Sequence, residues 1–134
     1  MPKLLALDVG TKRIGLAVAD VALAIAFPRG CIARNPKEVS LRYLRELTQA
    51  ESVERLVVGV PLGEDNEETD RSKDIRKFAG NVGAKLKLPV SFVDEFGTTR
   101  EALGRIPLKR DRKAKGADDA IAAQIILERY LAGR

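Results

Sequence analysis

Three separated acidic positions in this sequence could do chemistry together. Asp8 ends one apolar run directly before a Gly-containing turn, and Glu95 ends a second apolar run in the same manner. If these runs are parallel strands in the middle of a sheet, their carboxyl ends lie at the same edge, where open α/β sheets bind ligands. Two neighbouring carboxylates repel each other and therefore favour a cation between them. The sequence thus indicates a metal site built on Asp8 and Glu95.

The third candidate acid belongs to the pair Asp118–Asp119, at the start of the last expected helix. From Asp119 the helical spacing follows an apolar stripe suited to packing on a sheet, whereas from Asp118 it reaches the charged Arg129. The stripe from Asp119 contains Ala122 or Ala123, Ile126 and Tyr130. We therefore expect Asp119 to point inward as the third metal ligand and Asp118 to cap the helix, with Asp118 as the alternative ligand.

The available residue types restrict any such chemistry to oxygen ligands. The chain has no histidine and one cysteine, Cys31, which removes histidine-based nucleophile systems and thiolate zinc cages. Carboxylate oxygens select Mg²⁺ or Mn²⁺. Two such ions held about 4 Å apart stabilise the attacking and leaving oxygens of an in-line phosphoryl displacement. Taken singly, each acid could be a turn or helix cap, so the hypothesis depends on the three acting together.

Positive charge favours a polyanionic partner. The formal net charge is +5, which is compatible both with nucleic-acid binding and with a merely basic surface. Lys12 and Arg13 stand beside Asp8 and could steer a phosphate. A basic loop before the last helix could grip flanking phosphates or could be a solvated segment; it contains Lys109, Arg110, Arg112, Lys113 and Lys115. With four Phe, two Tyr and no Trp, we expect recognition by shape and charge more than by base stacking.

Hydrophobic periodicity indicates an α/β fold. Strands are expected at residues 4–8, 13–20, 30–33, 56–60 and 90–93, and helices at 38–51, about 75–86 and 118–131, with a short helix from Thr98 or Thr99 to about Arg105. The first strands form a hairpin, and the later strands alternate with helices, which predicts a mixed, partly parallel sheet. The chain contains no apolar run of about 18 residues, so we expect no membrane span and a cytoplasmic protein.

Several motifs, in order along nearly the whole chain, resemble those of the YqgF/RuvX family of Holliday-junction-resolvase-like proteins. Residues 8–20, DVGTKRIGLAVAD, resemble its opening signature, and VVGVPL at 57–62 resembles its central strand and Gly-x-Pro turn. Arg76 to Ala79, Asp94-Glu95 with Thr98-Thr99, and Asp119 with Ala122-Ala123 and Ile126-Leu127 resemble its later motifs. Phe96 and Gly97 stand where the family usually has Arg and Leu.

The resemblance implies a single ribonuclease H-like nuclease domain over residues 1–134. Its expected architecture is a mixed five-stranded sheet, with antiparallel hairpin strands followed by parallel strands, and helices on both faces. It further implies a metal-dependent nuclease site at Asp8, Glu95 and Asp119 that uses Mg²⁺ or Mn²⁺. Thr98, Thr99 and Arg100 are the nearby candidates for nucleic-acid contacts.

The family is associated with maturation of the 5′ end of the small-subunit ribosomal RNA precursor, which makes this the favoured function. The alternatives are a Holliday junction resolvase acting on branched DNA and a noncatalytic nucleic-acid-binding factor. An actin-like or sugar-kinase ATPase is disfavoured, because such enzymes pair two domains of this type and this chain supplies one. The sequence is compatible with a monomer or a homodimer.

Overall fold

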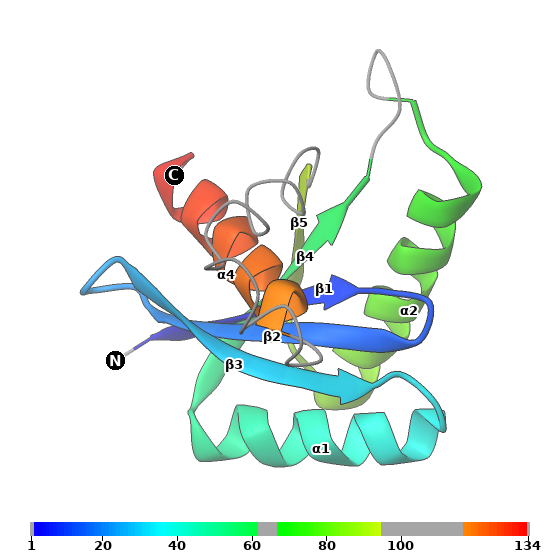
Figure 1. Ribbon diagram of the computed structural model, residues 1–134. Coiled ribbons are helices and arrows are strands. Elements are labelled where there is room, and N and C mark those ends of the chain that lie inside the picture. Colours follow the sequence, from blue (N-terminus) through cyan, green and yellow to red (C-terminus); the bar gives the residue numbers. More distant parts are fainter. Residues whose placement is uncertain (1, 62–66, 95–116, 134) are drawn as a thin grey trace.

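Five strands form one mixed sheet in the computed structural model, which describes residues 2–61, 67–94 and 117–133, with residues 117 and 118 described by their backbone alone. The strands are β1 (Lys3–Val9), β2 (Arg13–Asp20), β3 (Ile25–Ala33), β4 (Val53–Val60) and β5 (Val90–Asp94). Their order across the sheet is β3-β2-β1-β4-β5 (Figure 1). Pairing is antiparallel from β3 to β1 and parallel from β1 to β5. The expected hairpin followed by parallel strands is therefore confirmed.

Helices cover both faces of this sheet, as expected. Helices α1 (Lys37–Ala50) and α2 (Asp70–Leu86) lie on one face and α4 (Ala117–Ala132) on the other (Figure 1). The alternation of side chains along each strand explains this layering. Leu5 and Leu7 of β1 pack in the core beneath α1 and α2, whereas Leu4 and Ala6 pack against α4.

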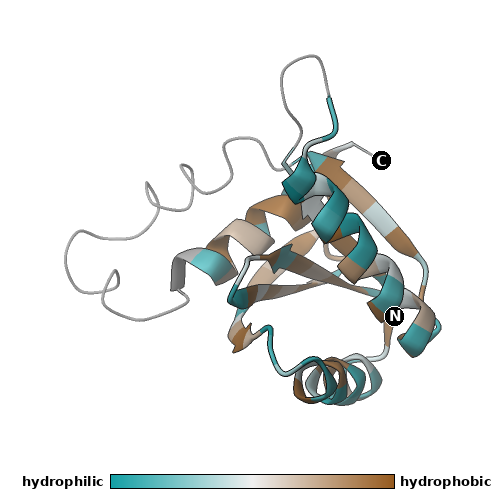
Figure 2. Ribbon diagram, turned by 90° about the vertical axis from the view of Figure 1, so that its right-hand side faces the viewer, coloured by the Kyte–Doolittle hydropathy of each residue, from teal (hydrophilic) through white to brown (hydrophobic). Residues whose placement is uncertain are grey.

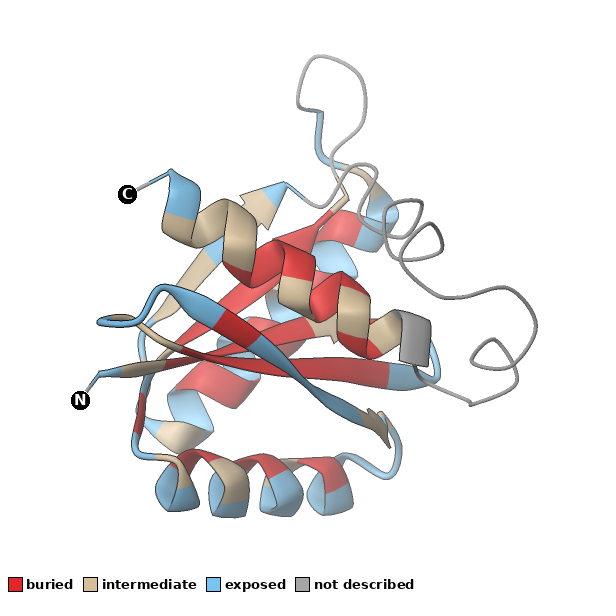
Figure 3. Ribbon diagram, turned by 60° about the vertical axis from the view of Figure 1, so that its left-hand side comes forward, coloured by how far each residue is buried: buried red, intermediate tan, exposed pale blue. Residues whose placement is uncertain are grey.

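Helices α1 and α2 are amphipathic and pack on the sheet through their apolar sides. Leu44 of α1 and Ile75 of α2 are fully buried in the core beneath the sheet. Helix α1 buries only the side turned toward the strands (Figure 3), and the outward side of α2 is hydrophilic (Figure 2). Thr69 caps the start of α2 in a reciprocal arrangement with Ser72, in which each side chain accepts from the other residue's backbone N–H at 3.0 and 2.7 Å.

The third strand is longer than the sequence indicated. The prediction of residues 30–33 is wrong at its start, because β3 begins at Ile25 and runs through Pro28. Proline is tolerated there because β3 is an edge strand, and its missing N–H costs no ladder bond on the outer side. The pairing with β2 shifts register between Gly15 and Ala17. Gly30, at φ 76°, takes up the extra residue as a bulge.

Two further expectations concern membrane-spanning helices and a short helix after the last strand. None of the helices within the described ranges is long and apolar enough to cross a bilayer. The short helix expected from Thr98 or Thr99 to Arg105 lies outside the described residues.

Candidate active site at the carboxyl end of the first strand

Asp8 is placed by the alternation of β1. It is the next residue after Leu4 and Ala6 on the face that packs against α4. It pairs across the hairpin with Gly15 of β2. Its side chain is partly exposed, near the end of the strand. A carboxylate with this placement is held by the rigid centre of the sheet and still reaches solvent.

Gly15 lets the start of α4 approach the sheet closely. A Cβ built on Gly15 would overlap the backbone carbonyl of Asp119 and lie 3.0 Å from the Asp119 Cβ. Directly paired residues on neighbouring antiparallel strands have Cα atoms about 4.5–5.5 Å apart. Because Gly15 is the cross-strand partner of Asp8 and also the contact of Asp119, the structure brings Asp8 and Asp119 to the same place on the same face. The lack of a side chain at Gly15 makes this convergence possible.

The Asp119 carboxylate faces a positive partner. Arg13, the first residue of β2, donates from Nε to Asp119 Oδ2 at 2.8 Å. The Arg13 side chain is 47% exposed and that of Asp119 is 25% exposed. Such an exposed ion pair contributes little to stability and is readily exchanged. The Asp119 carboxylate thus already takes a cationic partner, and the side chain of Asp118 is outside the described part.

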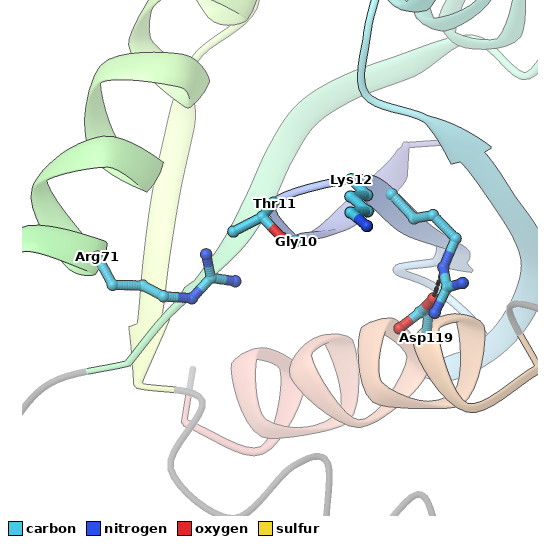
Figure 4. Close-up of a pocket in the computed structure, with 6 residues that line it drawn as sticks. Gly10, Thr11, Lys12, Arg71 and Asp119 are labelled. Atoms are coloured by element: carbon cyan, nitrogen blue, oxygen red, sulfur yellow. Dashed lines mark hydrogen bonds and ion pairs between the residues drawn. The ribbon is translucent and has the colours of Figure 1, made fainter.

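A pocket of about 360 Å³ opens beside this ion pair. Figure 4 shows Arg71 reaching into it from α2, while Asp119, the ion-pair partner of Arg13, lies at its other end. Its lining is formed by Gly10, Thr11, Lys12, Arg13, Arg71 and Asp119. Three cationic side chains and one carboxylate therefore surround a space next to the strand end that carries Asp8. A phosphate group is a fitting occupant for such a lining.

Two arginines hold the hairpin turn that forms the floor of this pocket. Arg71 donates from Nη2 to the backbone carbonyl of Val9 at 2.8 Å, and Arg34 donates from Nη1 to that of Gly10 at 3.0 Å. Within the turn, the Gly10 N–H donates to the Arg13 carbonyl at 2.7 Å. A Cβ on Gly10 would come 2.7 Å from that same carbonyl oxygen, so this tight turn favours glycine.

Sequence reasoning missed Arg71. It stands 62 positions from Val9, next to an acidic run, and nothing in its local pattern distinguishes it from a solvated charge. The signal available was its place in the first turn of a helix that follows the central strand β4. Such helices begin near the carboxyl edge of the sheet, where ligands bind.

Most of the remaining candidates lie outside the described residues. They are Glu95, Thr98, Thr99, Arg100, Lys109, Arg110, Arg112, Lys113 and Lys115. The chain leads to Glu95 from Asp94, whose backbone carbonyl accepts a hydrogen bond from Arg129 Nη1 of α4 at 3.0 Å. Among the residues that are described, no three acidic or cysteine side chains form a potential metal cage. Asp8 and Asp119 are therefore the part of the expected triad that the structure brings together.

Comparison with known proteins identifies relatives that align with nearly the whole chain. A family model described as "RuvX: Holliday junction resolvase" matches residues 2–133. A protein of Maridesulfovibrio salexigens is 36% identical over 132 residues, covering 97% of this chain and 98% of that protein. One from Chloroflexus aurantiacus is 37% identical over 134 residues, covering 98% and 87%. Both carry the name "Putative pre-16S rRNA nuclease".

Solved structures show the same fold at low sequence identity. Thermus thermophilus RuvC in complex with a Holliday junction substrate aligns with a TM-score of 0.60 at 14% identity, covering 100% of this chain and 96% of that one. The fowlpox virus Holliday junction resolvase aligns with a TM-score of 0.56 at 16% identity, covering 98% and 99%. The mixed sheet with helices on both faces is therefore a RuvC-like ribonuclease H fold.

Proposed function

The chain belongs to the RuvX family, and from this premise we propose that it is a nuclease that hydrolyses phosphodiesters in the precursor of 16S ribosomal RNA, at the 5′ end. The relatives that share 36–37% of its residues over nearly its full length carry that activity in their name. Ribosomal RNA processing places the proposed activity in the cytoplasm. A monomer or a homodimer is compatible with it.

The convergence of Asp8 and Asp119 is the observation that carries this proposal. Two acids 111 positions apart in the sequence meet on one face of the sheet, through Gly15, which leaves room for the backbone of Asp119. A purely structural role would not require both carboxylates at a partly exposed strand end beside a basic pocket. Metal-dependent hydrolysis of a phosphodiester uses such a combination of anionic metal ligands and cationic phosphate contacts.

The donors at this place fit divalent metal ions. They are carboxylate oxygens, the ligands of Mg²⁺ and Mn²⁺, and the Asp119 carboxylate already binds a cation, the Arg13 guanidinium, at 2.8 Å. Asp8 and Asp119 would hold the metal, with Glu95 as the proposed third ligand and Asp118 as the alternative to Asp119. Bound ions would supply charge stabilisation for the attacking and leaving oxygens.

The chain's own cations would bind and orient the substrate. Lys12 and Arg71 line the pocket from two sides, so they can hold a phosphate between the hairpin turn and α2. If Asp119 held a metal ion, the Arg13 guanidinium could exchange its contact with Asp119 for one with the substrate backbone. These contacts carry no base specificity, which suits a substrate recognised by its position and shape.

Glu95 is the acid whose role most needs a direct test. Arg129, which contacts Asp94, is ten residues along α4 from Asp119, about 15 Å at 1.5 Å per residue. Glu95 itself lies outside the described residues, so its place beside Asp119 is a proposal that its own variant tests.

The test is cleavage of a labelled 16S precursor fragment that carries its 5′ extension, in Mg²⁺ or Mn²⁺. We expect cleavage by the wild type and a loss of at least a hundredfold in Asp8→Asn, Asp119→Asn and Glu95→Gln. The matched control is Asp20→Asn, because Asp20 lies at the opposite end of β2, where it accepts from the Ala22 N–H at 2.9 Å. Loss in the control as well would mean that the site acids act through folding alone.

The description of the family model favours a second substrate, a four-way DNA junction. The same four variants are therefore assayed on a labelled junction and on its linear arms. Faster cleavage of the junction than of the RNA would show that the substrate is branched DNA. The proposed catalytic residues would then be unchanged. Tight RNA binding without cleavage in either metal would overturn the nuclease and leave a binding factor.

A further inference from the structure

A second pocket, of about 240 Å³, lies on the other side of the hairpin turn from Asp119. It is formed by the segment between β3 and α1 and by one face of α2. The α2 residues in it follow the i, i+3, i+7 spacing of a single helix face. Its polar lining consists of Arg34, Asn35, Lys37, Asp74, Lys77 and Asn81.

Arg34 connects this pocket rigidly to the candidate active site. It donates to both carboxylate oxygens of Asp74, at 3.0 and 2.9 Å, and lies 4.6 Å from the centroid of the Phe78 ring. The same guanidinium donates to the Gly10 carbonyl, which belongs to the first pocket. Because the side chain of Arg34 is only 14% exposed, it acts as a fixed wall between the two pockets.

The side chains that line this pocket carry a net positive charge. Asp74 is the carboxylate of the lining, and its hydrogen bonds from Arg34 hold its pKa below the usual range. Lys37 and Lys77 form no ion pair with any residue in the described ranges. Two ammonium groups therefore face the space from different helices, with the amides of Asn35 and Asn81 as further donors. This set suits an anion with several acceptor oxygens.

We propose that this pocket is a phosphodiester-binding subsite, which holds the substrate strand on the far side of the Gly10–Arg13 turn from the scissile bond. The inference rests on the proposed nuclease function. A strand is favoured over a small free anion because two basic pockets flank one turn and share Arg34 as a wall. A single strand lying over that turn would place one phosphate in the first pocket and a more distant phosphate of the same strand in the second. The substrate would then be positioned by backbone contacts at two points.

The test compares the double variant Lys37→Ala/Lys77→Ala with the control Arg42→Ala/Lys85→Ala. The control removes the same charge from the same two helices, at exposed positions outside the pocket. RNA binding is measured in EDTA, which prevents metal-dependent cleavage, with a four-nucleotide RNA and with a longer RNA extended on both sides. Salt dependence is measured for each pair.

For the longer RNA we expect the pocket variant to bind five- to tenfold more weakly than the control. The plot of log affinity against log salt should lose about 0.7 in slope, the value for one phosphate contact on a single strand. The four-nucleotide RNA should bind both double variants equally. In cleavage assays, KM for the longer RNA should rise in the pocket variant with kcat unchanged.

Other outcomes separate this proposal from the nuclease assignment. Equal binding of the longer RNA by both double variants would overturn the subsite, even if the wild type cleaves RNA normally. Weaker binding by the pocket variant in a protein that never cleaves would support the subsite and overturn the nuclease. If inorganic phosphate or a mononucleotide competes at the concentration at which the longer RNA binds, the pocket is a small-anion site and the strand subsite is wrong.

Discussion

The ion pair between Arg13 and Asp119 sets up a competition for one carboxylate. A metal ion would compete with the guanidinium for the charge of the Asp119 carboxylate, whose Oδ2 Arg13 contacts at 2.8 Å. Replacing Arg13 by Gln removes the competitor, so Mn²⁺ should bind more tightly. Exposed ion pairs are worth about 0.2–1 kcal/mol, which predicts an affinity gain of up to about fivefold. Isothermal titration with Mn²⁺ measures it directly.

The control for this prediction is Lys12→Gln. Lys12 lines the same pocket and carries the same charge, so its loss changes the local field without removing an Asp119 partner. Equal Mn²⁺ affinity in the two variants would show that general charge, and not the Arg13 contact, limits metal binding. If Arg13 then contacts the substrate backbone, Arg13→Gln should also bind RNA more weakly than the wild type does.

At the scale of elements, the contact between α4 and β2 depends on a missing side chain. A methyl group at Gly15 would overlap the Asp119 backbone, so Gly15→Ala should force the start of α4 away from the sheet. Overpacking of this kind costs about 1–3 kcal/mol, and nuclease activity should fall because Asp119 moves. Gly80→Ala is the control, because nothing lies within 4 Å of a Cβ there. Urea unfolding of both variants tests the prediction, and equal stability would contradict it.

The Arg34–Asp74 pair joins the segment after β3 to α2, and its contribution should depend on pH. The hydrogen bonds from Arg34 lower the folded pKa of Asp74 below its ordinary value of 3.8. A lowered pKa means that the stabilisation is complete above the unfolded value and is lost as pH falls through the folded one. Asp74 is 48% exposed, so Asp74→Asn should cost only about 0.5–1 kcal/mol near pH 7. This cost should begin to fall near pH 3.8 and vanish only below the lower pKa of the folded protein, which unfolding of both proteins from about pH 2 to 7 measures.

Periodicity in the sequence predicted the elements well because each pattern reflects burial against a neighbour. Leu5 and Leu7 alternate with Leu4 and Ala6, and the two sets pack on opposite faces. The same reasoning predicted that Asp8 and Asp119 lie at one edge of the sheet, because each stands at the end of a run of apolar, buried residues. The start of β3 was missed, because Pro28 reads as a strand boundary unless the strand is known to be an edge.

Contacts that arginines make with distant parts of the chain were not predictable in this way. Arg34 and Arg71 bind the carbonyls of Gly10 and Val9 from 24 and 62 positions away. A long, flexible, charged side chain carries no periodic signature of its partner, because its position is set by how the helices lie on the sheet. The roles of Glu95 and of the basic residues before α4 stay predictions, since they lie outside the described ranges.

At the scale of the whole molecule, the balance of charge should govern RNA binding. The chain has 24 Lys and Arg against 19 Asp and Glu, giving a net charge of +5. Besides Arg34, which is paired with Asp74, five cations line the two pockets: Lys12, Arg13, Arg71, Lys37 and Lys77. With one phosphate held by Lys37 and Lys77 together and one by each of the other three, at about 0.7 per contact on a single strand, log affinity against log salt should have a slope of about −2.8. Filter binding from 50 to 300 mM salt measures it, and a slope near zero would contradict a phosphate-based interface.

Because the chain has no histidine, we can also predict how its RNA affinity depends on pH. No side chain of ordinary pKa titrates between about pH 5.5 and 7 in a chain without histidine. The shifted carboxyls in the described ranges, Glu51, Glu68 and Asp74, all have lowered pKa values, mainly through hydrogen bonds from Lys3, Arg76 and Arg34, and so titrate further from this window.

The pH experiment uses Asp8→Asn with Mg²⁺ present, because this variant is expected to bind RNA without cutting it. Its RNA affinity at fixed salt should then stay constant within about twofold from pH 5.5 to 7. Any pH dependence of cleavage by the wild type in this window would belong to the reaction step or to its metal ligands. An affinity that rises steeply toward pH 5.5 would instead show that a carboxylate outside the site, protonated in the window, opposes the RNA.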